Sequence, residues 1–258
     1  MSRYKITIQY DGLNFSGFQS QKNLNTIQDK IEYSLSFLNK NNLIRVSGAS
    51  RTDAGVHALE QVINFHSSLY IEPSVIKTSS NKKMTDIQIN NISFEKEAFH
   101  ARKSAIKREY YYVFTDEDCP FHLRSFVSKV ELPIDIAAVN RFLNLLIGEH
   151  DFTLFRKTGS YEKHCVRKIY QAKCIKFQHK LLTDPEKSIT LYRIEIVGNA
   201  FLYRMVRNIV GCFFEMERPN SKFNLNTFKE AFKSKNKLQY KAKKKIKFYC
   251  PEKKKQIT

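Results

Sequence analysis

The sequence predicts a mixed α/β (α+β) fold with two domains, and three observations carry this prediction. Strand-like and helix-like patterns follow one another through the first hundred residues as β-α-β-β-α-β, the order of a small sheet with helices on one face. A second series of strands and helices begins near Ile106. The 258 residues, 42% hydrophobic and 27% charged, are enough for one large core or two modest ones.

The predicted N-terminal domain covers residues 1–104. Alternating apolar residues predict a strand at Tyr4–Tyr10, which ends at the Asp11-Gly12 turn. Apolar residues three and four apart predict a helix over Thr26–Leu38, capped by Asn25 or Thr26. The other predicted elements are strands at Leu43–Val46 and Gln61–His66, a helix at Ile71–Ser80 begun near Pro73, and a strand at Ile87–Glu95.

The predicted C-terminal domain covers residues 105–232, and a lysine-rich tail follows at 233–258. It opens with the strongly β-prone run Glu109–Phe114. No sequence repeat relates it to the first domain. The other predicted elements are an antiparallel strand pair at Val166–Phe177 and Ile189–Val197, helices at Ile134–Leu146, Tyr203–Phe214 and Asn220–Phe232, and a short strand at Ile246–Tyr249.

The formal net charge of +19 predicts a polyanionic partner, with nucleic acid or an anionic membrane surface as the candidates. About half of this charge lies in the tail, where residues 233–255 hold eleven Lys and one acid. A tail that only aids solubility would explain that half. The remaining positive charge still favours RNA or DNA.

Other classes of function are not indicated. The five Cys are odd in number, form no CxxC motif and lack a His at zinc-ligand spacing, which indicates reduced thiols rather than disulfides or a metal site. No apolar run approaches the roughly 18 residues that span a bilayer. Because the chain begins with a strand pattern rather than a signal sequence or an arginine-rich leader, we expect no targeting leader.

The loop Ser50-Arg-Thr-Asp-Ala-Gly-Val-His57 concentrates functional groups. The carboxylate Asp53 precedes a small turn, in which Ala54 and Gly55 leave room for another molecule and Gly55 can adopt a positive φ. Arg51 could pair with a phosphate or enter the space left by an extruded base. The local pattern alone favours an ordinary Asp-x-Gly turn in which Asp53 caps its own backbone.

A second segment interleaves basic and aromatic residues, at Phe99-His-Ala-Arg102 and Lys107–Tyr112. This spacing suits nucleic acid, because rings stack on bases while cations meet phosphates. The structural alternative is a half-buried strand whose alternate tyrosines fill the core. Tyr110 and Tyr112 then share one face of the strand, and Tyr111 points away.

A third segment, Asn199–Asn208, places Arg204 and Arg207 three residues apart on a helix that is otherwise apolar. Buried arginines on one helix face need partners, because an unpaired buried charge is costly. An arginine held beside a carboxylate would keep that carboxylate ionised. Exposure at the start of the helix is the alternative.

Together these segments resemble the tRNA pseudouridine synthase A (TruA) family. The similarity runs in order through most of the chain, and the Arg-Thr-Asp-Ala-Gly-Val-His-Ala wording is highly specific. Ser50, where many members have Gly, and the Phe-Leu-Tyr-Arg wording are closest to the eukaryotic pseudouridine synthase-like branch. The segments are Tyr10–Gln21, Ser50–Ala58, Phe99–Arg102, Lys107–Tyr110, Gly148–Phe152, Asn199–Asn208 and Gly211.

The resemblance implies two related domains, each a mainly antiparallel sheet with helices on one face, that flank a basic cleft holding the active site. It implies tRNA as the substrate, no cofactor or metal, no membrane, and a homodimer, which members commonly form. Family members isomerise uridine to pseudouridine in the anticodon stem-loop, typically at tRNA positions 38 to 40.

The same resemblance assigns roles to individual residues. Asp53 matches the family's essential aspartate, and Arg207 matches the arginine that pairs with it. Tyr110 matches the tyrosine that stacks on the target uracil, and Arg51 the arginine linked to base extrusion. Further candidates for RNA binding are His57, Arg102, Lys107 and Arg204.

The chemistry of pseudouridylation fits these residue types. The reaction breaks the N1–C1′ bond, turns the uracil and joins C5 to C1′. An ionised carboxylate can act as nucleophile or as base toward the sugar, and can stabilise positive charge at C1′. The sequence leaves these roles of Asp53 open. It contains no phosphate loop or metal cluster, and the reaction needs none.

The C-terminus departs from the family pattern. Members usually end in Ala-Pro-x-x-Gly-Leu-x-Leu followed by a strand near the active site, whereas Tyr240–Pro251 lacks the Gly-Leu signature. The alternative function is therefore a non-catalytic tRNA-binding or RNA-chaperone module of the same fold. A DNA-binding architectural protein would explain the charge but not the Asp53 loop. The predicted location is cytoplasmic, with the mitochondrion as the alternative.

Overall fold

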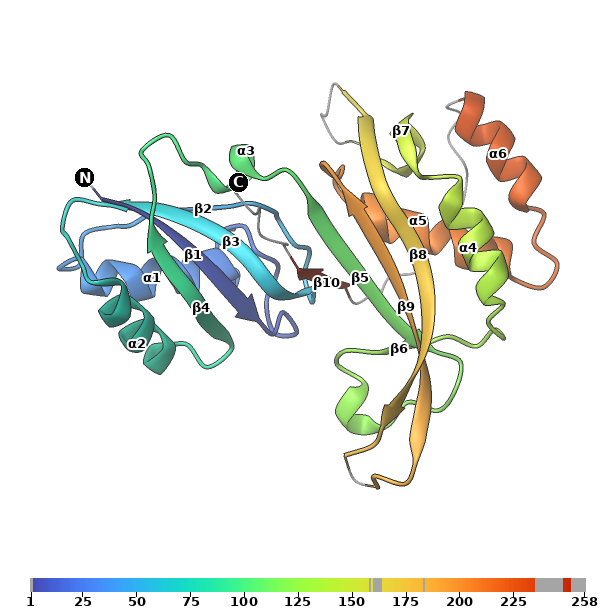
Figure 1. Cartoon of the computed structure of the whole chain (residues 1–258), viewed down its shortest axis with the longest axis horizontal. Helices are drawn as coiled ribbons and strands as arrows, with labels where there is room; N and C mark the ends of the chain where they lie inside the picture. The colour runs from blue at the N-terminus through green and yellow to red at the C-terminus, as the bar shows by residue number, and fades with distance from the viewer. Residues whose placement is uncertain (1, 158, 160–163, 183, 235–247, 252–258) are drawn as a thin grey trace. The chain divides into compact units, whose positions relative to one another are not determined.

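The computed structural model describes residues 2–157, 159, 164–182, 184–234 and 248–251 (Figure 1). The chain divides into two compact units: unit 1 comprises residues 1–108 and 248–258, and unit 2 comprises residues 109–247. Each unit combines a sheet with helices, so the mixed α/β prediction is confirmed. The lysine-rich tail lies largely outside the described residues, which include only 233–234 and 248–251 of it.

The sheet of unit 1 is built around β1, which pairs antiparallel with β3 on one side and β4 on the other. β2 pairs antiparallel with β3, and β10 pairs parallel with it. Helices α1, α2 and α3 complete the described part of the unit. The elements are β1 (Ser2–Tyr10), α1 (Ile27–Leu38), β2 (Val46–Gly48), β3 (His57–Ser67), α2 (Pro73–Lys83), β4 (Ile87–Phe94), α3 (Ala101–Ser104) and β10 (Phe248–Pro251).

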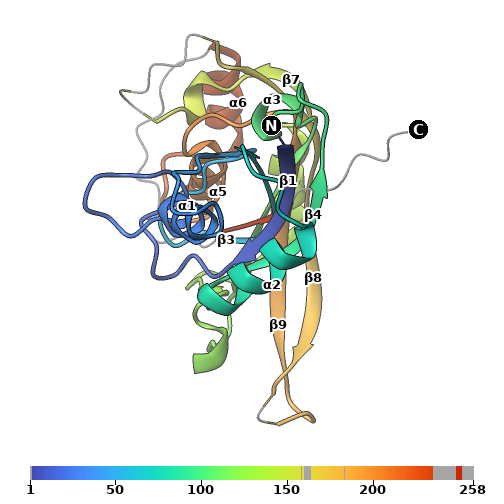
Figure 2. The same cartoon turned by 90° about the vertical axis from the view of Figure 1, so that its left-hand side faces the viewer.

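The core of unit 1 follows from the alternation in β1. The buried face of β1 meets the apolar stripe Ile27, Ile31 and Leu35 of α1, and Ile76 of α2 joins the same cluster. Each of these buried side chains contributes about 1.5–3 kcal/mol by leaving water. Both helices therefore cover one face of the sheet, as the sequence predicts (Figures 1 and 2).

Two strands of unit 1 differ from their predictions, and one of them is β3, which begins at His57 rather than Gln61. The strand expected at Leu43–Val46 begins only at Val46 and continues to Gly48. The physical reason lies in α1, because the Ile44 N–H donates to Ser36 Oγ at 2.8 Å and the Val46 N–H to Glu32 Oε1 at 3.0 Å. Helix side chains thus replace a neighbouring strand along this stretch. Thr26, one of the two predicted caps, closes the start of α1 by accepting from the Asp29 N–H.

The sheet of unit 2 has the strand order β5-β9-β8-β7, with the short β6 parallel to β5. The predicted antiparallel pair β8 and β9 is confirmed and extends into a long hairpin (Figure 2). The elements are β5 (Arg108–Thr115), the 3₁₀ turn η1 (Phe121–Leu123), β6 (Ser128–Lys129), α4 (Ile136–Asn144), β7 (Gly148–Asp151), the 3₁₀ turn η2 (Thr153–Phe155), β8 (Val166–Lys180), β9 (Ser188–Gly198), α5 (Met205–Met216) and α6 (Leu225–Ser234).

Aromatic residues pack together within the core of unit 2. The ring of Phe114 in β5 stands edge-on to Phe214 of α5, with centroids 5.3 Å apart. Phe142 of α4 lies 5.8 Å from Phe213 of α5 and 4.9 Å from Phe228 of α6. These contacts join α4, α5 and α6 through packed aromatic rings. The contact between Phe214 and Phe114 connects the same rings to β5.

All three described helices of unit 2 begin later than predicted. The helix expected from Ile134 starts at Ile136, where the Asp135 side chain caps it by accepting from the Ala137 N–H. The helix expected at Tyr203 starts at Met205, because Arg204 has a left-handed backbone with φ of 62°. The helix expected from Asn220 starts at Leu225, where the Asn224 side chain accepts from the N–H groups of Asn226 and Thr227. Within the described ranges, no helix is both long and apolar enough to cross a bilayer.

Candidate active site

The Asp53 loop, residues 50–57, is held by the segment 11–21 that follows β1. The Phe18 N–H donates to the Thr52 carbonyl at 3.0 Å, and the Gly55 N–H donates to the Phe15 carbonyl at 3.3 Å. The Thr52 hydroxyl lies 2.8 Å from the buried hydroxyl of Tyr10. Hydrogen bonds therefore fix the loop backbone on both sides of Asp53.

Two glycines in that segment make this close approach possible. A Cβ atom on Gly12 would lie 2.0 Å from the Val56 carbonyl oxygen. Gly17 has a φ of 107°, and its Cβ atom would lie 2.9 Å from the Thr52 carbonyl oxygen. Any side chain at either position would push the Asp53 loop away, which explains why Asp-Gly and Ser-Gly steps are found here.

Asp53 itself is half-buried and opens a tight turn, since the Val56 N–H donates to the Asp53 carbonyl at 3.2 Å. Gly55 adopts the predicted positive φ, at 76°, and an added Cβ atom there would meet nothing within 4 Å. Ala54 is exposed. The loop thus leaves room beside the carboxylate, as the sequence predicts.

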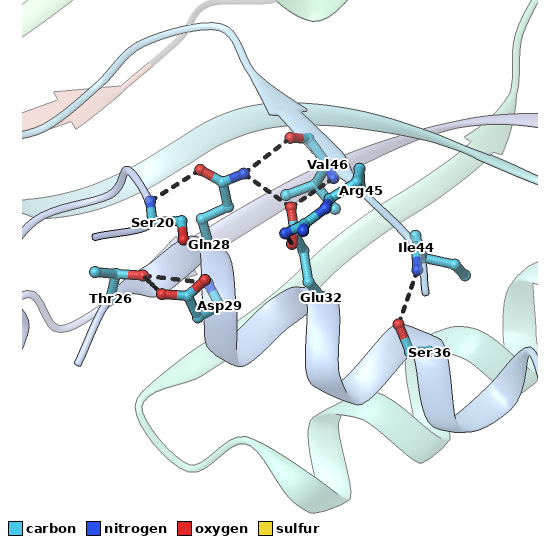
Figure 3. Close-up of polar contacts among 9 residues, drawn as sticks. All are labelled: Ser20, Thr26, Gln28, Asp29, Glu32, Ser36, Ile44, Arg45 and Val46. Atoms are coloured by element: carbon cyan, nitrogen blue, oxygen red, sulfur yellow. Dashed lines mark hydrogen bonds and ion pairs between the residues drawn. The ribbon is translucent and has the colours of Figure 1, made fainter. Parts of the chain in front are cut away.

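A polar stripe on α1 holds the segments that lead into and brace this loop (Figure 3). Gln28 accepts from the Ser20 N–H at 3.0 Å and donates to Glu32 Oε1 at 2.8 Å. Glu32 in turn accepts from the Val46 N–H at 3.0 Å and from Arg45 at 2.8 Å. One helix face therefore ties the bracing segment to β2, the strand before the Asp53 loop.

Arg108 fixes the beginning of the same loop. Its guanidinium donates through Nε and Nη2 to the Ala49 carbonyl, both at 3.1 Å, and through Nη2 to the Arg102 carbonyl at 2.9 Å. Such charge-assisted bonds are stronger than neutral ones. Arg108 thereby attaches the residues around α3 to the start of the Asp53 loop.

The other predicted residues of unit 1 differ in exposure. Arg51 is exposed and donates to Gln19 Oε1 at 2.8 Å. Arg102 and Lys107 are also exposed. His57, a predicted RNA-binding residue, is only 2% exposed, and its Nδ1 lies 3.0 Å from Asp11 Oδ1. That burial does not favour a contact between His57 and RNA.

The tyrosines of β5 separate as the alternation predicts. Tyr110 is half-buried and stands edge-on to Phe201, with ring centroids 5.0 Å apart. Tyr112 belongs to the core, where burial raises the pKa of its hydroxyl to about 12. Tyr111 donates instead to Glu109 at 2.8 Å, with the Arg193 guanidinium over its ring. Tyr110 is thus the less buried of the two same-face rings.

The two arginines around the start of α5 do not share a helix face, which corrects the sequence interpretation. Arg207 is the third residue of α5 and is half-buried, whereas Arg204 precedes the helix and is exposed. A left-handed backbone at a residue other than glycine costs roughly 1–2 kcal/mol. Arg204, whose φ is 62°, carries this strain.

Comparison with known proteins decides the family. A family model described as tRNA pseudouridine synthase matches residues 6–102 and 143–248. A protein of Anoxybacillus flavithermus named tRNA pseudouridine synthase A is 38% identical over 220 residues, which cover 84% of this chain and 85% of that protein. The chain belongs to the tRNA pseudouridine synthase family.

Other members of this family show similar agreement. tRNA pseudouridine synthase A 1 of Bacillus cereus is 36% identical over 213 residues, 82% of each chain. The protein of that name from Protochlamydia amoebophila is 35% identical over 244 residues, which cover 93% of this chain and 90% of that one. The closeness to a eukaryotic branch is not tested by these bacterial proteins and stays a prediction.

The family match includes most, but not all, of the predicted site. Asp53, Arg51 and Arg207 fall within the matched residues, whereas Lys107 and Tyr110 lie between its two parts. The sequence interpretation did not single out Gln28, Glu32 or Arg108 as supports of the loop. The spacing of Gln28, Glu32 and Ser36, four residues apart on an otherwise apolar helix face, is the signal that was available.

Proposed function

We propose that this protein is a tRNA pseudouridine synthase, an isomerase that converts uridine to pseudouridine in the anticodon stem-loop, typically at positions 38 to 40. The observation that carries the proposal is the family match, which includes the braced loop with Asp53 at its turn. The curated relatives named tRNA pseudouridine synthase A support the choice of substrate.

In this proposal Asp53 is the catalytic carboxylate and Arg207 is the arginine that pairs with it. Tyr110 stacks on the target uracil, and Arg51 takes part in extruding the base. The exposure of Arg51 and the open space at Gly55 support a loop that receives a nucleotide. Arg102, Lys107 and Arg204, all exposed, are proposed contacts to the RNA backbone.

The reaction is a balanced rearrangement. The N1–C1′ bond breaks and a C5–C1′ bond forms, while the proton on C5 is lost and N1 gains one. Asp53 acts either as nucleophile at C1′ or as base, and its half-buried position suits both roles. Neither the bond exchange nor the proton transfer requires a cofactor or a metal.

Finer features follow from the family and belong to the same proposal. We propose an N-terminal domain of residues 1–104, a C-terminal domain of residues 105–232, and a basic cleft that holds the site. We also propose a homodimer and a cytoplasmic location. The tail, residues 233–258, extends the RNA-binding surface in this account.

The non-catalytic alternative depended on the missing Gly-Leu signature near the C-terminus. β10, at Phe248–Pro251, nevertheless pairs parallel with β3, with Tyr249 opposite His57. A C-terminal strand therefore lies directly beside the residue that ends the Asp53 loop. The loss of the signature does not remove that strand, which weakens the argument for a module without turnover.

The proposal is tested by incubating the wild-type protein with unmodified tRNA transcripts and mapping pseudouridine by carbodiimide-dependent primer extension. Matched transcripts carry cytidine in place of each candidate uridine of the anticodon arm. Modification that disappears with those uridines supports the proposal. Pseudouridine elsewhere in the tRNA would overturn the target site, and none in any tRNA would overturn the enzyme.

A further inference from the structure

We propose that Lys157, Tyr203 and Arg204 form an RNA-contacting surface of unit 2, the Tyr203 platform, in which the ring meets an unpaired base and the cations meet the phosphates beside it. The inference rests on the proposed function, because it takes its tRNA partner from there. It adds two residues, Lys157 and Tyr203, that the sequence interpretation did not select.

The platform is an exposed ring with two cations against it. Lys157 Nζ lies 4.9 Å from the centroid of the Tyr203 ring, and Arg204 Cζ lies 5.4 Å from it. The Tyr203 side chain is 42% exposed, and both cations are exposed as well. Rings that stack on bases beside cations that meet phosphates are the usual elements of single-stranded nucleic-acid binding.

Hydrogen bonds hold the platform in place. The Lys157 N–H donates to the Tyr203 carbonyl at 3.3 Å, and the Asn208 N–H donates to the Arg204 carbonyl at 2.9 Å. Asn208 Nδ2 also donates to the Phe155 carbonyl at 2.8 Å. The segment after η2 is thus joined by hydrogen bonds to the residues that lead into α5 and to its first turn.

The backbone at Arg204 points to use of its side chain. Its φ of 62° is a conformation in which glycine is relaxed and other residues are strained. Among the residues that the structure describes, no carboxylate pairs with Arg204, and its guanidinium lies over the Tyr203 ring instead. The exposed guanidinium of Arg204 is well suited to binding a phosphate group.

The place of the platform in the chain connects it to the proposed reaction. Tyr203 and Arg204 directly precede α5, and Arg207 is the third residue of that helix. RNA held by the platform would therefore lie at the same helix end as the arginine proposed to pair with Asp53. A purely structural role, as a cap for α5, is the competing explanation.

The experiment measures the dissociation constant for unmodified tRNA over a series of salt concentrations, together with thermal unfolding, for full-length variants. Arg204→Gly removes the charge and relieves the backbone. Tyr203→Ala removes the ring, and Tyr203→Phe keeps it. Tyr33→Ala is the matched control, because Tyr33 is 77% exposed on the outer side of α1.

The expected results differ for ring and charge. Tyr203→Ala should weaken binding by about 5-fold to 150-fold with an unchanged salt slope, whereas Tyr203→Phe and Tyr33→Ala bind like wild type. Arg204→Gly should make the negative slope of log K against log salt less steep by about 0.7–0.9, while the melting temperature stays level or rises. That opposition of binding and stability is not expected of a helix cap.

Wild-type affinity and salt slope in both Tyr203→Ala and Arg204→Gly would overturn the inference. Loss of binding accompanied by an equal loss of folding stability in Arg204→Gly would do so too. Pseudouridine formation by the wild type, measured in the same preparations, tests the proposed function separately. A wild type that modifies tRNA, with variants that bind normally, would leave the proposed function intact and remove only the platform.

Discussion

Gly12→Ala tests the claim that the segment after β1 sets the position of the Asp53 loop. The new Cβ atom would lie 2.0 Å from the Val56 carbonyl oxygen, whereas ordinary contact begins at 3.4 Å. The carbonyl belongs to the backbone and cannot rotate away as a side chain could. The end of the Asp53 loop must therefore move by about 1 Å, the order of the difference between these two distances.

The displacement should affect catalysis more than folding. A misplacement of about 1 Å at reacting groups can lower kcat by about 100-fold. Forcing an extra methyl group into filled space costs about 1–3 kcal/mol. For a chain of this size, each kcal/mol lowers the melting temperature by roughly 2–4 °C. Gly12→Ala should therefore remain folded at room temperature but turn over tRNA about 100-fold more slowly.

The assay combines single-turnover pseudouridine formation on unmodified tRNA with thermal unfolding. Gly159→Ala is the matched control, because an added Cβ atom at this exposed glycine meets nothing within 4 Å. It should keep wild-type turnover, although its positive φ adds a small backbone strain. Wild-type kcat and melting temperature in Gly12→Ala would show that the loop is not braced as described.

Two further predictions concern stability. Glu32→Ala should destabilise unit 1 by about 2–3 kcal/mol, because it leaves the Val46 N–H without its buried acceptor. Arg45→Ala should cost under about 1 kcal/mol, because the Arg45 side chain is 67% exposed. Equal losses of unfolding free energy for the two variants in urea would contradict this assignment. The pKa of His66 lies below its ordinary value of 6.5, mainly because of burial and to a lesser extent because of the nearby positive charge of Arg3. His66 therefore binds a proton more readily in the unfolded chain than in the folded one. The free energy of unfolding should therefore fall as the pH drops below about 6.5. His66→Gln should reduce the difference between the urea midpoints measured at about pH 7.5 and about pH 5.5. If His66 instead made the protein more stable on acidification, the predicted direction of the pH dependence would be wrong.

Elements with a strong apolar period were predictable from sequence. The alternation at Tyr4–Tyr10 and the three-four spacing over Thr26–Leu38 each indicated an element with one face buried in a core. The structure contains both elements, as β1 and α1. Element ends were less accessible, because they depend on single backbone conformations. Arginine rarely adopts a left-handed backbone. The residue type at position 204 therefore gave no indication of this conformation, which makes α5 begin later than predicted.

The candidate site was predictable where residue types carry the chemistry. The Asp53 loop combined a carboxylate, an arginine and a permissive glycine in eight residues, and its positive φ at Gly55 followed from that composition. The supports of the loop were not singled out. The four-residue spacing of Gln28 and Glu32 was a signal for two of them, whereas Arg108 bonds to a backbone carbonyl 59 residues away in sequence. A long-range contact to a carbonyl such as that of Ala49 leaves no local pattern.

The central claim is that Asp53 carries the isomerisation of uridine, and Asp53→Asn tests it most directly, since this change nearly preserves side-chain size. The measurement is pseudouridine formation on unmodified tRNA by the wild type, by Asp53→Asn and by Asp118→Asn, a control at a carboxylate that is 97% exposed in unit 2. The account predicts product from the wild type and the control, none from Asp53→Asn, and tRNA binding by all three. Turnover by Asp53→Asn at the wild-type rate would contradict it.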